Sequence, residues 1–332
     1  VMQSNLLSVT YFNHFVRYAE EQKVDLAPFW RTLDHDGNDP SITLSTLKQL
    51  VVFLWSSGCP KSLGLEVGKN INLASHGHVG YGLSHMKDLE ESLVFLCEYY
   101  KVRAQILRFR LEEDDESIFL CIEPTVEWGE IRTVLYETIA TLGYNIIKFA
   151  IGKKAKDITV EMPFEQPSWS VLYSECLSNT VSYGHEILRF EIPLHWKSIR
   201  CVSADPATSE MAAQQCRLEM ARLIDEQSLS EKVNELISSS IQFGLSLEQA
   251  AKTLYMSKST FIRKLKQEDT TFKQLMEAAK KRHAQYLLIN TSQKIESISL
   301  QLGYEDLSNF GRSFKRWFGC SPSQFREQQS HM

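Results

Sequence analysis

Three histidines lie close together in the first third of the chain and could bind a transition metal: His76, His78 and His85. No carboxylate or cysteine joins them at a spacing that known metal sites use. Gly80, Gly82 and Ser84 stand between them, but a dinucleotide-binding loop would need glycine instead of His85, and a nucleophile elbow would need glycine instead of Met86. We therefore predict no catalytic residue, no metal site and no cofactor here. We interpret the segment as a tight turn between helices that can contact an effector.

Basic side chains near the C-terminus recur in two stretches that each predict a helix, a tight turn and a second helix. In the first stretch, residues 246–268, Ser246 and Gln249 predict a capping box at the start of a helix. The apolar face of this helix consists of Leu247, Ala250, Ala251 and Leu254. Ser257 then caps a second helix, whose Phe261 and Leu265 face the first. Its outward side carries Lys258, Ser259, Ile262, Arg263 and Lys266.

The second stretch, residues 295–319, repeats this pattern. The apolar stripe of its first helix consists of Ile295, Ile298 and Leu302. Gly303 ends that helix at little cost, because glycine adopts the left-handed conformation easily. Glu305 or Asp306 then caps the second helix. The inward face of that helix consists of Phe310, Phe314, Trp317 and Phe318, and its outward face of Leu307, Ser308, Gly311, Arg312 and Lys315.

Residues 272–289, between the two stretches, predict one continuous helix. Such a spacer would hold the two outward-facing helices in a fixed relation. If both lie on one side, we expect them to enter successive major-groove segments, about one helical turn or ~34 Å apart.

The segment LGYEDLSNFGRSFKRWFGCSPSQFR, residues 302–326, resembles the AraC/XylS family of bacterial transcription regulators. The matching residues are Leu302, Gly303, Tyr304, Ser308, Phe310, Arg312, Phe314, Lys315, Trp317, Phe318, Gly319, Pro322 and Arg326. The resemblance covers about residues 229–328 and has two departures: Ser299 stands where alanine is usual, and Asp269 where glycine is usual. Neither forbids the fold, because aspartate tolerates the left-handed conformation and a helical serine can bond back to its own backbone.

Carried over by position, the resemblance implies a set of residues that face DNA bases. This set is Ser259, Ile262, Arg263, Leu307, Ser308, Gly311 and Arg312. Arginine can pair bidentately with guanine for roughly 1 to 3 kcal/mol of discrimination, so Arg263 and Arg312 are the main candidates for base readout. We expect Lys258, Lys266, Lys315 and Arg316 to contact the DNA backbone. Solvated side chains, or phosphate contacts that carry no sequence information, remain the alternative for all of these basic residues.

The first two hundred or so residues predict a mixture of helices and strands. Helical periodicity covers residues 11–24, 43–55, 89–100 and 131–149, and strand patterns cover 105–111, 117–123, 157–162 and 186–192. The acidic turn EEDDE joins the first two strands. The phrases GLEVGKN and GHVGYGLSHMKDLEESLVFL resemble the N-terminal regulatory domain of one branch of the same family, often called arabinose-binding, over about residues 6–193. This resemblance implies a sensor domain without naming its ligand.

The C-terminal part of the chain differs in charge from the rest, which supports separate functions for the two parts. Residues 228–332 hold 15 Lys and Arg against 10 Asp and Glu, a formal charge of +5, whereas the whole chain carries −5. We predict an α+β regulatory domain at residues 1–203, a helical linker at 204–227, and an all-α DNA-binding domain at 228–332 with two helix-turn-helix units joined by a linker helix. In residues 204–227 we expect a linker with partial dimer contact, and a dimer seam is the alternative.

The seven cysteines stand singly, which indicates reduced thiols rather than a disulfide framework or a zinc site. No signal peptide or membrane-spanning run is visible, so we expect a cytoplasmic protein.

We therefore expect a sequence-specific transcription regulator, an activator, with no enzymatic activity. Its expected partners are double-stranded promoter DNA, a small-molecule effector of unknown identity, RNA polymerase and a second copy of the chain, but no membrane. A helical scaffold for protein contacts is one alternative, and it predicts apolar outward faces. An enzyme that uses an N-terminal cleft is the other, and it requires a convergent catalytic cluster.

Overall fold

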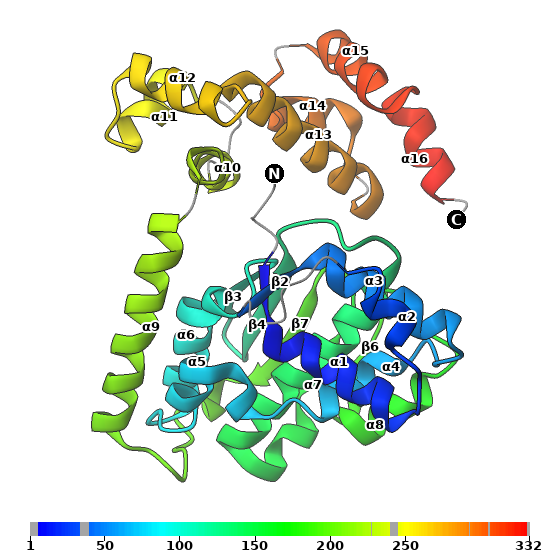
Figure 1. Ribbon diagram of the computed structural model, residues 1–332, viewed down its shortest axis with the longest axis vertical. Helices are drawn as coiled ribbons and strands as arrows, with labels where there is room; N and C mark the ends of the chain where they lie inside the picture. Colours follow the sequence, from blue (N-terminus) through cyan, green and yellow to red (C-terminus); the bar gives the residue numbers. More distant parts are fainter. Residues whose placement is uncertain are drawn as a thin grey trace. The chain divides into compact units, whose positions relative to one another are not determined.

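The chain divides into two units, Val1–Asp225 and Glu226–Met332. The computed structural model describes residues 6–33, 40–226, 228–239, 245–291, 293–304 and 306–330 (Figure 1). The first unit mixes helices and strands and the second is helical, which confirms the predicted fold class. Among the helices formed by the described residues, none combines the length and the apolar character that crossing a bilayer requires.

The first unit contains a five-stranded sheet. Its order is β3 (Leu107–Glu113), β4 (Ser117–Pro124), β7 (Leu188–Pro193), β5 (Thr159–Glu161) and β6 (Thr180–Ser182). Neighbouring strands are antiparallel except for β5 and β6. Along β7 the fully buried residues alternate with half-buried ones, so one face of the strand packs against the core. Four of these strands match the predicted ranges within two residues, and β6 was not predicted.

The predicted acidic turn is shorter than expected. Glu112 and Glu113 continue β3, where they pair with Phe119 and Ile118 of β4. The turn is closed by Asp114, whose carboxylate accepts hydrogen bonds from the backbone N–H groups that follow it. Antiparallel pairing therefore extends into a segment whose charges alone suggested a loop, because side chains at the edge of the hairpin can point into solvent.

Helix α7 (Arg132–Ile151) is buried along most of its length and lies between the sheet and α4 (Leu63–Lys69). Glycines permit both contacts. A Cβ at Gly64 would lie 2.4 Å from Val134 O, and one at Gly68 would lie 2.8 Å from Thr138 O. On the other side of α7, a Cβ at Gly143 would meet the ring of Phe190 at 2.8 Å. The glycines of the GLEVGKN phrase thus allow two helix backbones to approach closely.

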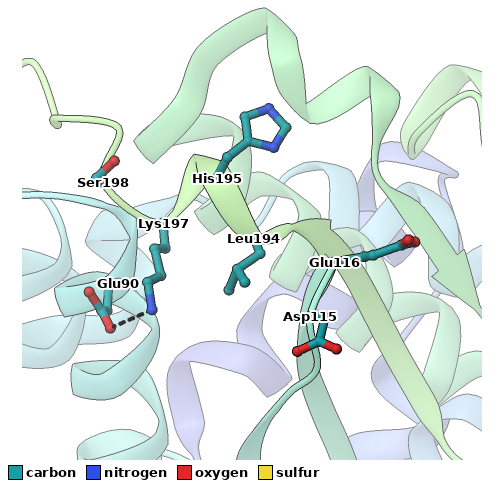
Figure 2. A pocket seen from close by; sticks show the side chains of 7 residues that line it. All are labelled: Glu90, Asp115, Glu116, Leu194, His195, Lys197 and Ser198. Carbon is teal, nitrogen blue, oxygen red and sulfur yellow. Dashed lines mark ion pairs between the residues drawn. The ribbon is translucent and has the colours of Figure 1, made fainter.

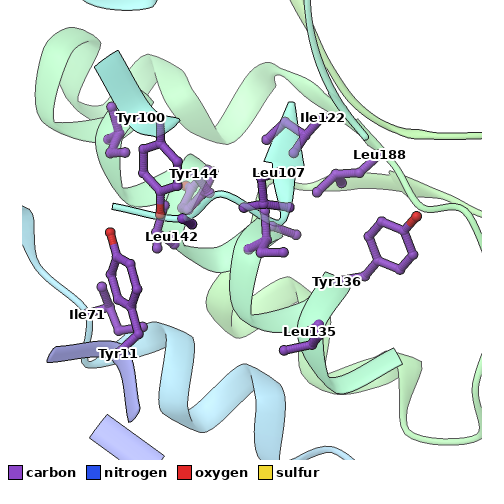
Figure 3. Close-up of a cluster of buried hydrophobic side chains, with 14 of the residues drawn as sticks. Tyr11, Ile71, Tyr100, Leu107, Ile122, Leu135, Tyr136, Leu142, Tyr144 and Leu188 are labelled. Carbon is purple, nitrogen blue, oxygen red and sulfur yellow. The ribbon is translucent and has the colours of Figure 1, made fainter. Parts of the chain in front are cut away.

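Apolar side chains from α7, from the strands and from the surrounding helices form the core of the first unit (Figure 3). The figure labels Leu135 and Leu142 of α7 together with Leu107, Ile122 and Leu188 of the sheet. The remaining helices of this unit cover the core: α1 (Val9–Glu21), α2 (Ala27–Trp30), α3 (Leu44–Ser56), α5 (Gly77–Leu83), α6 (Leu89–Tyr99) and α8 (Tyr173–Cys176). A short antiparallel pair, β1 (Leu6–Ser8) and β2 (Ser41–Thr43), precedes α1 and α3.

Most of the glycine-rich segment is a helix, α5, and the predicted tight turn is confined to Gly77, whose φ is +58°. A Cβ at Gly80 would lie 1.7 Å from Leu73 O, and one at Gly82 would lie 2.5 Å from the ring of Phe95. Gly80 and Gly82 are therefore required because the helix packs closely against its neighbours, and not because the backbone turns at these positions. A short 3-10 helix, Leu73–His76, leads into α5.

The predicted linker is a single helix, α9 (Pro206–Glu226), of which all residues but the last belong to the first unit. Gln227 lies outside the described residues. The helix docks through small side chains, since Ala213 and Cys216 are buried in the core of the first unit. Glu219 of α9 also bonds to His78 of α5, over 2.5 Å from Oε1 to Nδ1. In Figure 1 the helix runs beside α5 and α6.

The second unit has two small cores that share α13 (Phe272–Asn290). The first core joins α10 (Leu229–Ser239), α11 (Leu247–Thr253) and α12 (Lys258–Gln267) to Ala279 of α13. The second joins α14 (Ile295–Gln301), α15 (Leu307–Phe318) and α16 (Pro322–Ser330) to Ala284 and Leu287 of α13. With 19 residues at 1.5 Å each, α13 is about 28 Å long, which confirms the predicted continuous spacer.

Candidate nucleic-acid interface

The first helix-turn-helix unit consists of α11 and α12. The predicted capping box is present: Gln249 N donates to Ser246 Oγ over 3.1 Å, and Ser246 N donates to Gln249 Oε1 over 2.8 Å. Ser257 caps α12 by accepting a hydrogen bond from Thr260 N over 3.2 Å. The buried face of α12 consists of Phe261 and Leu265. Local capping and burial of these two residues therefore fix which side of α12 faces outward.

The outward face of α12 carries the five predicted residues, all of them exposed: Lys258, Ser259, Ile262, Arg263 and Lys266. Lys258 forms an ion pair with Glu248 of α11. The guanidinium of Arg263 and the ammonium of Lys266 have no hydrogen-bonding or ionic partner among the described residues. These two cations are therefore available to a negatively charged partner.

The second helix-turn-helix unit consists of α14 and α15. Gly303 ends α14 with φ of +71°, as predicted. Asp306 caps α15 by accepting from Asn309 N over 2.6 Å, whereas the alternative cap, Glu305, lies outside the described residues. Phe310 and Phe314 are fully buried. Trp317 and Phe318 are half-buried and pack against the same core.

The two departures from the family pattern have different outcomes. Asp269 has φ of +52°, so the expected left-handed conformation is confirmed. Ser299 is buried, and its Oγ has no hydrogen-bond partner among the described residues. The bond from Ser299 back to its own helix, which the sequence allowed, is therefore not formed.

The outward face of α15 carries the predicted residues as well. Exposed side chains are Leu307, Ser308, Arg312, Lys315 and Arg316. Gly311 is half-buried, and a Cβ placed on it would meet nothing within 4 Å. Another surface, such as a DNA groove, can therefore approach the backbone of α15 closely at Gly311.

Corresponding side chains in α12 and α15 occupy the same place relative to their caps. Arg263 is the sixth residue after Ser257, and Arg312 is the sixth residue after Asp306. Lys266 and Lys315 are the ninth residues after the same two caps. Each helix therefore presents a paired arginine and lysine on its outward face at equal helical angles.

Apolar side chains stand among these cations. Ile262 is 45% exposed and Leu307 is 43% exposed. A purely apolar outward face would favour a protein-binding scaffold, and neither helix has one. A mixed face suits a major groove, because apolar groups can contact the methyl group of thymine while arginines contact guanine.

Glu277 of α13 ties α15 to the spacer helix. Its Oε1 accepts a hydrogen bond from Trp317 Nε1 over 2.8 Å and another from Arg316. These two bonds hold the pKa of Glu277 below its usual range. Lys281, one turn further along α13, lies over the ring of Phe318 at 5.0 Å. Arg316, a predicted phosphate contact, is therefore already engaged within the protein.

Three residues spaced three apart at the start of α15 form a chain that the sequence prediction did not contain. Asp306 Oδ2 accepts from Asn309 Nδ2 over 2.5 Å, and Asn309 Oδ1 accepts from Arg312 Nη2 over 2.6 Å. Their spacing, which places them on one side of a helix, was the signal that could have revealed them. Sequence reasoning also missed α10, which Glu268 caps by accepting from Leu229 N and Ser230 N, each over 2.8 Å.

In the first unit, a surface hollow is lined by seven residues, of which all but one are charged or polar (Figure 2). It is lined by Glu90, Asp115, Glu116, Leu194, His195, Lys197 and Ser198. Lys197 lies between two carboxylates, with Nζ 3.7 Å from Glu90 and 3.4 Å from Glu113. Ligand pockets are usually apolar with a few polar groups, so this hollow does not identify an effector site.

Two titratable side chains are buried inside the first unit. Burial raises the pKa of Glu137 to about 7, although Trp169 Nε1 and Tyr173 OH both donate to its Oε1. Burial lowers the pKa of His76 to about 3, and its Nδ1 lies 2.7 Å from Tyr11 OH. His76 is therefore neutral in the core. Among the described residues, no three His, Cys, Asp or Glu side chains form a group that could hold a metal ion.

Two family models match most of the chain. The model described as the arabinose-binding domain of AraC transcription regulator, N-terminal, matches residues 34–198. The model described as a helix-turn-helix domain matches residues 250–328 and so includes α12 and α15. The two matches fall in the two structural units.

Curated relatives are transcription regulators. The ornithine utilization regulator of Pseudomonas aeruginosa is 30% identical over 273 residues, which cover 80% of this chain and 78% of the relative. The regulator VqsM of the same species is 24% identical over 90% of this chain and 96% of the relative. The regulator VirS of Mycobacterium tuberculosis is 29% identical over 58% of this chain and 56% of its own length.

A solved structure shares the architecture. The transcriptional regulator CdpR from Pseudomonas aeruginosa superposes with a TM-score of 0.50 at 16% sequence identity, covering 96% of this chain and 98% of that one. At this identity the similarity concerns the fold.

Proposed function

The chain belongs to the AraC family of DNA-binding transcription regulators, and from that premise we propose that α12 and α15 read two unlike half-sites of one promoter. The base-facing residues in this proposal are Ser259, Ile262 and Arg263 in α12, and Leu307, Ser308, Gly311 and Arg312 in α15. One chain presents two different sets of side chains. A single protomer can therefore recognise an asymmetric site.

The observation that carries this proposal is the equal placement of Arg263 and Arg312, each six residues after a helix cap and each exposed. In a helix-turn-helix, residues near the start of the second helix contact base edges. Lys266 and Lys315 lie one turn further along, where phosphates border the groove. The cations of Lys258 and Arg316 are already paired with carboxylates, so a phosphate contact from either would add less to affinity.

The base-reading role can be tested on the full-length protein with a duplex selected from a random pool. We expect that Arg263→Ala and Arg312→Ala each weaken binding to the selected duplex by about 5- to 150-fold, which corresponds to 1–3 kcal/mol. Lys264→Ala is the matched control, because Lys264 lies in α12 between the proposed contacts and is also exposed. Equal affinities of the arginine variants and the wild type in fluorescence anisotropy would refute the role.

Control by a small-molecule effector is the second part of the proposal. The first unit matches a domain described as arabinose-binding, and one relative is named for ornithine utilization. A ligand that binds the folded first unit raises its thermal midpoint by mass action. We expect one member of a panel of sugars and amino acids that includes arabinose and ornithine to do so, and to change promoter affinity as well.

Transcription activation and self-association complete the proposal. The outward side of α9 exposes two large apolar residues, Met211 at 66% and Leu218 at 50%. Two copies of this helix can pair through them, so Met211→Asp with Leu218→Asp should lower the mass measured by sedimentation.

An in vitro transcription assay with RNA polymerase tests activation. The proposal includes a regulatory role without enzymatic activity, in the cytoplasm, and membership of the family supports it.

A further inference from the structure

The guanidinium of Arg312 is held by a neighbouring amide, whereas that of Arg263 is not. Arg312 Nη2 donates to Asn309 Oδ1 over 2.6 Å, and Asn309 in turn donates from Nδ2 to Asp306 Oδ2 over 2.5 Å. We propose that Asn309 is a positioning residue that preorganises Arg312 for base readout. This inference rests on the proposed role of Arg312 as a base contact.

The cap of α15 fixes the orientation of Asn309. Asp306 accepts two hydrogen bonds from Asn309, one from the backbone N–H to Oδ1 over 2.6 Å and one from the side-chain amide to Oδ2. Because the NH₂ group of Asn309 faces Asp306, its Oδ1 must face the other way along the helix. Arg312, three residues later, lies on that side and donates a hydrogen bond to this oxygen.

The bond to Asn309 leaves most of the guanidinium free. Arginine has five N–H donors, and this contact occupies one of them. The edge that remains can still form two hydrogen bonds to the O6 and N7 atoms of guanine. A long side chain that is already ordered loses fewer rotamers on binding, so positioning raises both affinity and discrimination.

The corresponding position in α12 does not hold an arginine in this way. Thr260 stands three residues after Ser257 and three before Arg263, as Asn309 does between Asp306 and Arg312. The hydroxyl of Thr260 bonds to Ser257 Oγ over 2.9 Å, and Arg263 has no partner among the described residues. The second unit should therefore discriminate among bases more sharply than the first.

Removing Asn309 should leave the helix itself intact. The capping bond from Asn309 uses its backbone N–H, which alanine retains, and the side chain of Asn309 is exposed. Asn309→Ala therefore removes the side chain that positions Arg312 and keeps the bond that caps α15. Asn309→Ser, which keeps a small polar side chain favoured near helix starts, provides a second variant if alanine lowers the thermal midpoint.

The test selects duplexes from a random pool with the full-length wild type and with Asn309→Ala, Arg312→Ala and the double variant, and measures the base preference at each position. We expect Asn309→Ala to reduce discrimination three- to tenfold at the same positions that Arg312→Ala affects, and nowhere else. In the Arg312→Ala background, Asn309→Ala should add nothing. Thr260→Ala is the matched control in α12 and should leave the preferences unchanged.

Each of three results would overturn the inference, and the three have different consequences for the proposed function. If Asn309→Ala left every preference intact while Arg312→Ala erased some, positioning would be wrong and the base-reading role would stand. If Asn309→Ala still had an effect without Arg312, Asn309 would contact DNA itself. If Arg312→Ala changed nothing, both the inference and the role of Arg312 in the proposed function would fall.

Discussion

Tyr255 and Gly303 occupy the same place in two successive helix-turn-helix units, and both have positive φ, +55° and +71°. In both turns the next residue donates its backbone N–H to a matching carbonyl, from Met256 to Ala251 over 2.8 Å and from Tyr304 to Ser299 over 3.1 Å. The turn therefore imposes a left-handed backbone on a tyrosine in one unit and on a glycine in the other. Tyr255 is also 98% exposed, so burial offsets none of its strain.

Tyr255→Gly should stabilise the second unit by about 1 kcal/mol, because the left-handed conformation costs an L-residue roughly that much net of the extra backbone entropy of glycine. Gly303→Ala should cost about as much. Thermal unfolding of the full chain measures both changes. A lower midpoint for Tyr255→Gly would show that the tyrosine side chain has a stabilising contact.

Ser299→Ala should stabilise the second unit by about 1 kcal/mol. The variant removes a buried hydroxyl that has no partner among the described residues, and alanine favours the helix. Ala251→Ser is the matched control, since Ala251 is the buried counterpart in α11, and it should destabilise by a similar amount. Chemical denaturation measures both, and destabilisation by Ser299→Ala would mean that a buried water or other acceptor satisfies the hydroxyl.

Glu137 should make the first unit less stable as the pH rises. Its pKa is 4.5 in the unfolded chain and about 7 in the folded one, so the folded state binds more protons between these values. The contribution is complete below pH 4.5 and is lost as the pH rises through 7. Between pH 5 and pH 8 the wild type should lose roughly 2–3 kcal/mol more than Glu137→Gln.

The stability of the wild type must be compared with that of Glu137→Gln, because titration of His76 changes stability with pH in the opposite direction. Its pKa falls from 6.5 to about 3, so its contribution is present above pH 6.5 and is lost as the pH falls towards 3. The difference between wild type and Glu137→Gln cancels this effect. Parallel stability curves for the two proteins would show that Glu137 is ionised in the folded state.

Lys266→Ala and Lys315→Ala should weaken binding to specific and unrelated duplexes alike, because phosphate contacts carry no sequence information. Each should reduce the slope of log affinity against log salt by about 0.9. Lys258→Ala and Arg316→Ala should have smaller effects, since carboxylates of Glu248 and Glu277 already pair with these cations. Equal slope changes for all four variants would mean that DNA displaces both carboxylates.

Much of the helical structure could be predicted from periodicity, because burial of one face imposes the spacing of apolar residues. This holds for α11 to α15, where Phe261 and Phe310 fix the outward sides. The three-residue strands β1, β2 and β6 were not predicted, because so few residues hardly show alternation, whereas the equally short β5 lies within a predicted strand of six residues, 157–162. The helix α5 was missed because glycine suggests a turn, whereas close approach to Leu73 and Phe95 is what requires Gly80 and Gly82.

Within the candidate site, exposure could be predicted and side-chain partners could not. Helical spacing placed Arg263 and Arg312 outward. The pairing of Arg316 with Glu277 joins residues far apart in sequence, and it depends on how α15 packs on α13. The hydrogen bonds of Asn309 are local, but many other rotamers of asparagine are open at such a position, and periodicity does not select one.

Base reading by Arg263 and Arg312 is tested most directly by the ratio of affinities for a selected duplex and for a scrambled one of equal length, at one stated salt concentration. In the Arg263→Ala, Arg312→Ala double variant we expect this ratio to fall about 100-fold or more, while affinity for the scrambled duplex changes far less. A ratio equal to that of the wild type would contradict base reading by these two arginines.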